Sequence, residues 1–211
     1  MTKMTTALAA AGLMLALLST AALAQPNTPA PPGTPVVRVA QMPKTVKPQF
    51  KRQSVRLVTT EAPGTIIIDT NHKYLYLVEG RNRATRYGIG VGREGFGWNG
   101  RANIRRKAEW PTWTPPAEMI RRQPELREYA RGMPGGLENP LGARAMYLYQ
   151  GDRDTLYRIH GTNEPLTIGT RVSSGCIRMI NQDVIDLYRR VPTGSRVVVL
   201  ADTGGDDAFS F

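Results

Sequence analysis

Two short segments in the last third of the chain hold residue types that can do covalent chemistry. The sequence contains one cysteine and two histidines, and Cys176 lies sixteen positions after His160. Each ends or follows an apolar, strand-like run, so a sheet could present both side chains to one groove. A free thiol with a pKa of about 8.5 is only a few per cent thiolate at neutral pH, so a cysteine nucleophile needs a proton acceptor. His160 can take that proton and later return it to a leaving amine.

The residues beside Cys176 fit the same chemistry. Gly175 lets backbone approach a substrate closely, and the N–H groups of Gly175 and Cys176 could face a developing oxyanion. Arg178 could add positive charge near the sulfur. The alternatives for a single cysteine are a small buried hydrophobic residue or an intermolecular disulfide. The other histidine, His72, lies in an expected hairpin turn, and we interpret it as a surface residue.

A second motif over residues 90–95 has the G-x-G-x-x-G pattern of a dinucleotide fingerprint. That fingerprint needs a helix to begin at this point, so that the helix N-terminus meets the pyrophosphate. Gly97, Trp98, Asn99 and Gly100 follow instead and disfavour a helix, so we interpret the glycines as a turn-rich loop. One cysteine and two histidines also fall short of the common four-ligand zinc sites. We therefore expect no cofactor and no metal.

The elements that must position these side chains are mainly β. Short β-branched or alternating runs predict strands. The predicted strands cover residues 65–69, 74–78, 84–91, 145–149, 156–160 and 196–200. A charged helix is expected over 117–130 with an interruption at Pro124, and a second helix over 183–190, where apolar residues share one face.

The N-terminus has the layout of a secretory signal peptide over residues 1–24. Lys3 precedes an apolar run over 7–18, and Ala22-Leu23-Ala24 forms an A-x-A cleavage site. The run is too short for a permanent bilayer span, although an uncleaved anchor is the alternative. No cysteine follows the site, so we do not expect a lipid anchor. We expect cleavage near Ala24 and a mature protein in the periplasm or cell envelope, which disfavours nucleic acid as a partner.

Residues 25–63 are expected to form a proline-rich basic linker before a domain over 64–200 and a tail over 201–211. Seven of the 26 positions from 25 to 50 are proline, a density that favours an extended, semi-rigid spacer. The formal net charge is +11, and residues 25–60 contribute six basic and no acidic side chains. This segment is either a solvated spacer or a tether to an anionic envelope polymer.

At the catalytic candidates the sequence resembles the L,D-transpeptidase catalytic domain (YkuD family) of exported bacterial enzymes. The resemblance rests on His-Gly-Thr at 160–162 and Ser-Ser-Gly-Cys-Ile-Arg-Met at 173–179, with Asn181 close behind. It runs from about Gly64 to Leu200. It also includes the Ile-Ile-Ile-Asp-Thr-Asn run, Tyr-Gly-Ile-Gly-Val-Gly, Pro-Thr-Trp-Thr-Pro-Pro and Asn-Pro-Leu-Gly in the family's order.

The resemblance implies a mainly β, sandwich- or barrel-like domain with a few short helices and a lid-like insertion. It implies that Cys176 is the nucleophile and His160 the general base and acid. The Gly161 carbonyl would orient the imidazole, and the amides of Gly175 and Cys176 would hold the oxyanion. The other supporting candidates are Arg178, Asn181 and Ser174, of which Ser174 receives no indispensable role because family members vary there.

The resemblance also implies that the segment between residues 92 and 141, which holds all three tryptophans, forms a wall or lid over the groove. Trp113 and Tyr147 are the substrate-groove candidates. For two of the three tryptophans we favour simple packing against the sheet.

The implied substrate is the tetrapeptide stem of peptidoglycan. The thiol would attack the bond between the third residue, commonly a diamino acid, and D-Ala, and form a thioester. An amine of another stem would then give a 3-3 cross-link, or an amine of an outer-membrane protein or lipoprotein would accept the acyl group. Carbapenems would acylate Cys176. The alternatives are an L,D-carboxypeptidase, a non-catalytic wall-binding module and a sortase-like enzyme, and the acceptor stays open because the groove selects it.

Overall fold

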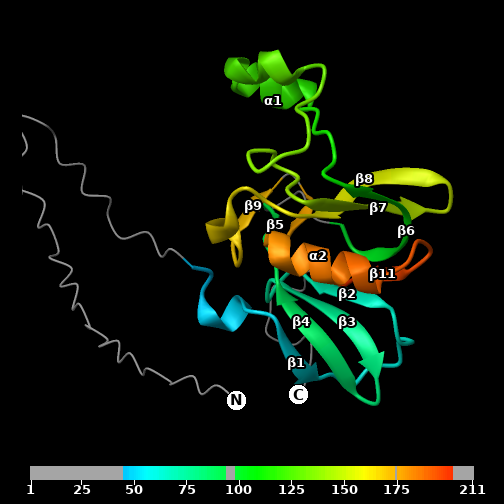
Figure 1. Cartoon of the computed structure of the whole chain (residues 1–211). Coiled ribbons are helices and arrows are strands. Elements are labelled where there is room, and N and C mark those ends of the chain that lie inside the picture. The colour runs from blue at the N-terminus through cyan, green and yellow to red at the C-terminus, as the bar shows by residue number, and fades with distance from the viewer. Residues whose placement is uncertain (1–44, 94–97, 174, 202–211) are drawn as a thin grey trace, which may run out of the picture. The chain divides into compact units, whose positions relative to one another are not determined.

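The computed structural model describes residues 45–93, 98–173 and 175–201. These residues form a nine-stranded sheet in the order β1-β4-β3-β2-β11-β6-β7-β8-β10 and a separate β5-β9 pair (Figure 1). The strands are β1 (Gln53–Arg56), β2 (Ile66–Asp69), β3 (Tyr74–Gly80), β4 (Arg83–Gly88), β5 (Val91–Gly92), β6 (Gly100–Glu109), β7 (Arg144–Gln150), β8 (Arg153–His160), β9 (Arg171–Ser173), β10 (Ile177–Arg178) and β11 (Arg196–Val199). The helical elements are η1 (Pro48–Phe50), α1 (Ala117–Arg122), η2 (Pro124–Tyr129), η3 (Pro165–Thr167) and α2 (Asn181–Arg190). The expected mainly β architecture with a few short helices is confirmed.

Several predictions concern residues outside the described ones. They are the signal peptide, the linker up to residue 44, Ser174, part of the glycine motif and the tail from residue 202. Within the described ranges, no helix has the length and apolar character needed to cross a membrane.

Strand β2 lies next to the central strand β11, and its three consecutive isoleucines are buried on both faces of the sheet. Ile66 and Ile68 belong to the main core, whereas Ile67 points to a second cluster on the other face. β2 pairs antiparallel with β3 and parallel with β11, where Ile67 lies opposite Tyr76 and Val198. A run of β-branched residues suits a strand that packs on both sides, so this element follows directly from its composition.

Helix α2 covers the main core through the apolar face that the sequence predicts. Val184 and Leu187 are fully buried, and Val191, just after the helix, is 1% exposed. Lys107 of β6 donates hydrogen bonds of 2.7 Å to the carbonyls of Tyr188 and Val191 at the C-terminal end. A cation at that end complements the helix dipole. These bonds fix the C-terminal end of the helix, and Asn181 begins its other end five residues after Cys176.

The structure differs from the predicted linker in its last third, because η1 and β1 pack onto the domain. Phe50 is buried, and a Cβ atom on Gly88 would lie 2.4 Å from it. Arg52 forms a 2.9 Å ion pair with Asp186 of α2, and β1 pairs antiparallel with β4. β1 carries largely exposed, polar residues, so it has no hydrophobic pattern, and only its partner strand makes it a strand. We call residues 48–56 the N-terminal strap.

Part of the expected lid, strand β6, also belongs to the sheet. β6 lies between β11 and β7, yet only Ala102 and Ile104 of its ten residues are buried. The rest of the segment, residues 110–141, forms an arm that holds α1 and η2, separated near Pro124 as predicted. Neither helix buries a residue, and Figure 1 shows α1 away from the sheet. Because the outer positions of β6 are charged, its sequence lacks a strand pattern, and pairing with the neighbouring strands stabilises it.

Candidate active site

The structure brings His160 and Cys176 to neighbouring parallel strands. β8 ends at His160 and pairs with β10, where Ile177 lies opposite Ile159 and Arg178 opposite His160. The backbone N–H of Met179 donates to the His160 carbonyl at 2.9 Å. Cys176 lies immediately before β10, so the nucleophile candidate and the base candidate are held by one short parallel pair.

The imidazole of His160 is buried and has a defined tautomer. Its Nδ1 lies 2.6 Å from the carbonyl oxygen of Gly161. A carbonyl only accepts, so Nδ1 carries the proton and Nε2 is the basic atom. Burial lowers the pKa of His160 to about 4; the Gly161 hydrogen bond opposes this shift, and the nearby charges of Arg178 and Arg158 add to it. The ring is therefore neutral at neutral pH and able to accept a proton.

The thiol of Cys176 lies against the backbone of β8. It donates a weak hydrogen bond to the Leu156 carbonyl at 4.0 Å. Burial raises the pKa of Cys176, while a hydrogen bond from the backbone N–H of Arg158 and the charges of Arg158 and Arg178 partly offset that effect. At neutral pH the thiol, whose pKa is raised, and the imidazole, whose pKa is lowered, are therefore both uncharged.

The turn that presents Cys176 is held by a serine that sequence reasoning missed. The Ser173 hydroxyl donates to the Cys176 carbonyl at 2.6 Å and accepts a 3.2 Å hydrogen bond from the Gly175 N–H. Gly175 has a φ of +110°, which favours glycine. The Gly175 N–H, expected to hold an oxyanion, is thus engaged by Ser173 in this structure. The sequence signal for this role was the position of Ser173 three residues before Cys176, in Ser-Ser-Gly-Cys.

Asn181 supports the residue that orients His160. Its Oδ1 accepts a 2.9 Å hydrogen bond from the Ala143 N–H. A Cβ atom on Gly161 would lie 2.2 Å from the same oxygen, and one on Gly142 would lie 2.3 Å from it. Asn181 therefore packs directly on the glycine whose carbonyl binds the imidazole. The two supporting candidates Gly161 and Asn181 are together in space.

Two guanidinium groups flank the thiol, and each has a carboxylate partner. Arg178 contacts Glu164 at 2.8 Å, and its Nε is buried without a hydrogen-bond partner among the described residues. Arg158 binds Asp154 through two hydrogen bonds of 2.7 and 2.9 Å. Sequence reasoning missed Arg158, although a residue two positions before His160 on a strand shares its face. Both charges act to lower the pKa of Cys176, against the effect of burial.

The two groove candidates occupy different places. Tyr147 lies opposite Arg158 across β7 and β8, and is 8% exposed. Trp113 pairs through its backbone with Met133 across the base of the arm, by hydrogen bonds of 2.9 and 2.7 Å. Tyr147 therefore lies two residues along β7 from Ala145, the residue opposite His160, whereas Trp113 belongs to the arm. Their contact with a substrate stays a prediction.

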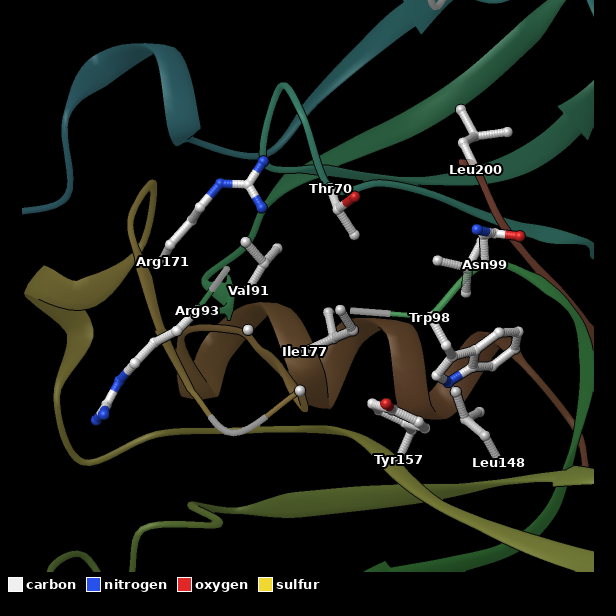
Figure 2. A pocket seen from close by; sticks show the side chains of 13 residues that line it. Thr70, Val91, Arg93, Trp98, Asn99, Leu148, Tyr157, Arg171, Ile177 and Leu200 are labelled. Atoms are coloured by element: carbon white, nitrogen blue, oxygen red, sulfur yellow. The ribbon is translucent and has the colours of Figure 1, made fainter. Parts of the chain in front are cut away.

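A pocket of about 170 Å³ lies beside the segment of Cys176 (Figure 2). Gly175 and Ile177, on either side of Cys176, line it, but Cys176 and His160 do not. Figure 2 shows Trp98 and Tyr157 close together, and their ring centres are 5.6 Å apart. Because side chains alternate along a strand, the pocket opens on the face of β10 opposite Arg178. It is adjacent to the reacting pair rather than around it.

His72 lies in the turn between β2 and β3 and has a local role. Its Nδ1 is 2.7 Å from Oδ2 of the buried Asp69. Asp69 also accepts hydrogen bonds from the backbone N–H groups of Asn71 and His72. No set of three His, Cys, Asp or Glu side chains suited to a metal ion occurs in the described part of the chain.

Comparison with known proteins identifies the family. The model for the L,D-transpeptidase catalytic domain, YkuD, matches residues 63–199, so the chain belongs to this family. The probable L,D-transpeptidase YbiS of Escherichia coli (strain K12) is 36% identical over 153 residues, which cover 69% of this chain and 47% of the relative. The probable L,D-transpeptidase ErfK/SrfK of the same strain is 36% identical over 157 residues, 70% of this chain and 47% of the relative. The chain thus spans about half the length of these curated relatives.

Solved structures share the fold. A structure from Brucella melitensis, described as a probable carnitine operon oxidoreductase, is 53% identical with a TM-score of 0.51, and the match covers 74% of this chain and 96% of that chain. The Ldtfm–avibactam carbamoyl enzyme has a TM-score of 0.50 at 18% identity, over 67% of this chain and 50% of that chain, which shows a common fold. In the present chain the next described element after Gly92 is strand β6, where a dinucleotide fingerprint has a helix.

Proposed function

We propose that the chain is a cysteine-dependent peptidoglycan L,D-transpeptidase. The observation that carries the proposal is the parallel pairing of β8 with β10, which brings a buried, neutral imidazole with an unprotonated Nε2 beside the segment of the single cysteine. Family membership supports the same chemistry. The substrate is a tetrapeptide stem, attacked at the bond between its third residue and D-Ala.

The first half-reaction forms a thioester. The Cys176 thiol passes its proton to Nε2 of His160 while the sulfur attacks the carbonyl carbon of the third residue. The carbon–nitrogen bond then breaks, and the imidazolium returns the proton to the departing D-Ala amine. Arg158 and Arg178 stabilise the developing negative charge. The acyl group stays on the sulfur, and His160 is again neutral.

The second half-reaction transfers the acyl group to an amine. His160 removes a proton from the side-chain amine of a second stem as its nitrogen attacks the thioester carbonyl. The carbon–sulfur bond breaks, and the sulfur regains a proton from the imidazolium. The product is a 3-3 cross-link. An envelope protein would supply an amine in the same step, and water would make the protein an L,D-carboxypeptidase.

The test gives purified residues 25–211 a disaccharide-tetrapeptide and follows products by mass spectrometry. Loss of D-Ala together with dimer formation is the expected result, and loss of D-Ala alone assigns hydrolysis. Cys176→Ala should abolish D-Ala release, and full activity in that variant would overturn the mechanism. A carbapenem should add its mass to the wild-type protein and not to Cys176→Ala.

The N-terminal residues before the domain serve export and tethering. Residues 1–24 direct the chain to the cell envelope, and the basic linker holds the domain near anionic envelope polymers. Deletion of residues 25–44 removes Arg38 and Lys44, two of the six basic side chains, and should leave turnover of small muropeptides intact while partly weakening the binding of whole sacculi. That binding should fall as salt is added, and salt-insensitive binding would contradict an electrostatic tether.

A further inference from the structure

Three side chains form a row across β6, β7 and β8. Arg106 lies opposite Tyr147, and Tyr147 lies opposite Arg158. The guanidinium carbon of Arg106 is 3.8 Å from the centre of the Tyr147 ring, and that of Arg158 is 4.5 Å from it. The tyrosine thus makes a cation–π contact with an arginine from each neighbouring strand. We call these three residues the arginine–tyrosine row.

The row begins at the nucleophile. Arg158 is two residues before His160, and its partner Tyr147 is two residues after Ala145, which lies opposite His160. Side chains two apart on a strand share a face, so the row and the imidazole lie on the same face of the sheet. The Cys176 thiol contacts β8 at the Leu156 carbonyl, two residues before Arg158, and the charge of Arg158 acts to lower the thiol pKa. The row therefore extends from β8, next to the segment of Cys176, across β7 to β6.

The two arginines of the row differ in how their charge is balanced. Asp154 binds Arg158 through both of its carboxylate oxygens. Arg106 is exposed and forms no ion pair among the described residues, although its charge helps to lower the pKa of Asp154, the carboxylate that binds Arg158. Its neighbour Arg105, in contrast, is paired with Asp152. Arg106 is thus a cation that the Tyr147 ring orients and that the described chain leaves available to a carboxylate.

We propose that the arginine–tyrosine row binds the acyl-donor peptide and that Arg106 binds a carboxylate of that peptide, which makes an acidic stem the preferred donor. The inference rests on the proposed function and adds its substrate class. Strands are about 4.8 Å apart, so β6 lies roughly 14 Å from β10, three spacings away. An extended peptide advances about 3.3 Å per residue. The Arg106 side chain turns back over Tyr147 by about one strand spacing, and an ion pair spans roughly 3 Å more. Its carboxylate partner would therefore lie one or two residues before the attacked carbonyl.

The experiment compares two tetrapeptide stems that differ only in one group, a free or an amidated carboxylate before the third residue. Wild-type protein and Arg106→Gln are assayed for D-Ala release. Arg106→Gln should lower kcat/KM for the free-acid stem about fivefold, mainly through KM, the size expected for an exposed charge pair. It should leave the amidated stem unchanged. The matched control Arg105→Gln removes an adjacent cation of β6 outside the row and should affect neither stem.

A binding measurement separates this inference from the proposed function. Cys176→Ala protein, with and without Arg106→Gln, is titrated with both stems at low and high salt. Tighter, salt-sensitive binding of the free-acid stem that depends on Arg106 supports the row, even if the wild type releases no D-Ala and the proposed function fails. Equal binding of both stems, or equal losses for both in Arg106→Gln, would overturn the inference.

Discussion

Replacement of Gly161 by alanine tests the support of the catalytic histidine most directly. The added Cβ would lie 2.2 Å from Oδ1 of Asn181 and 3.0 Å from the Ala143 nitrogen, whereas ordinary contacts begin at 3.4 Å. The overlap with Asn181 is therefore about 1 Å. Either Asn181 moves and loses its hydrogen bond from Ala143, or Gly161 moves and its carbonyl leaves Nδ1 of His160.

Either movement should lower both the stability of the domain and the rate of reaction. A buried polar group that loses its partner costs about 1–3 kcal/mol. At about 2–4 °C per kcal/mol for a domain of this size, the melting temperature should fall by several degrees. A displacement of about 1 Å near reacting groups costs on the order of 100-fold in rate. We therefore expect kcat for D-Ala release to fall about 100-fold in Gly161→Ala, while Tm falls moderately.

The assay measures D-Ala release and thermal unfolding for Gly161→Ala and for Gly136→Ala. Gly136 has open space around its Cα and no positive φ, so its alanine variant should keep full activity. Adding Asn181→Ala removes the overlapping atom, so the loss in the double variant should be smaller than the sum of the two single losses. Retention of kcat within threefold by Gly161→Ala, or strict additivity, would refute the reasoning.

Three further predictions follow from the site and the strap. The rate at which iodoacetamide alkylates Cys176 should rise in a single step with pH, at a pKa above that of an ordinary thiol, because burial raises the thiol pKa and His160, with a pKa of about 4, stays neutral. A plateau of this rate between pH 5 and 7 would instead indicate a thiolate–imidazolium pair. Ser173→Ala removes both hydrogen bonds of the nucleophile turn and should lower kcat about tenfold with KM nearly unchanged, and Ser173→Thr should recover part of it. Phe50→Ala should destabilise the domain by about 3 kcal/mol, measured by denaturant unfolding, whereas exposed Leu137→Ala should not; an equal effect of both would show that the strap is not part of the domain.

The main elements of the fold were predictable where composition carries the signal. The isoleucines of β2 are buried on both faces, and the apolar face of α2 packs on the core, as their spacing indicates. The strap and β6 escaped prediction for one shared reason. Their outward side chains are polar or charged, and their strand character comes from hydrogen bonds to β4, β11 and β7. Such pairing joins residues far apart in the chain, which local patterns do not record.

The site residues, too, were predictable from the sequence only in part. Residue type alone identified the single cysteine and the histidine with a glycine after it, because few side chains supply a nucleophile and a base near neutral pH. Only the tertiary structure determined that Nδ1 of His160 is the protonated nitrogen, that Ser173 holds the turn of Cys176, and that Arg106 lies in line with the thiol. These properties depend on strand register and burial, which set distances and pKa values between residues that the sequence leaves apart.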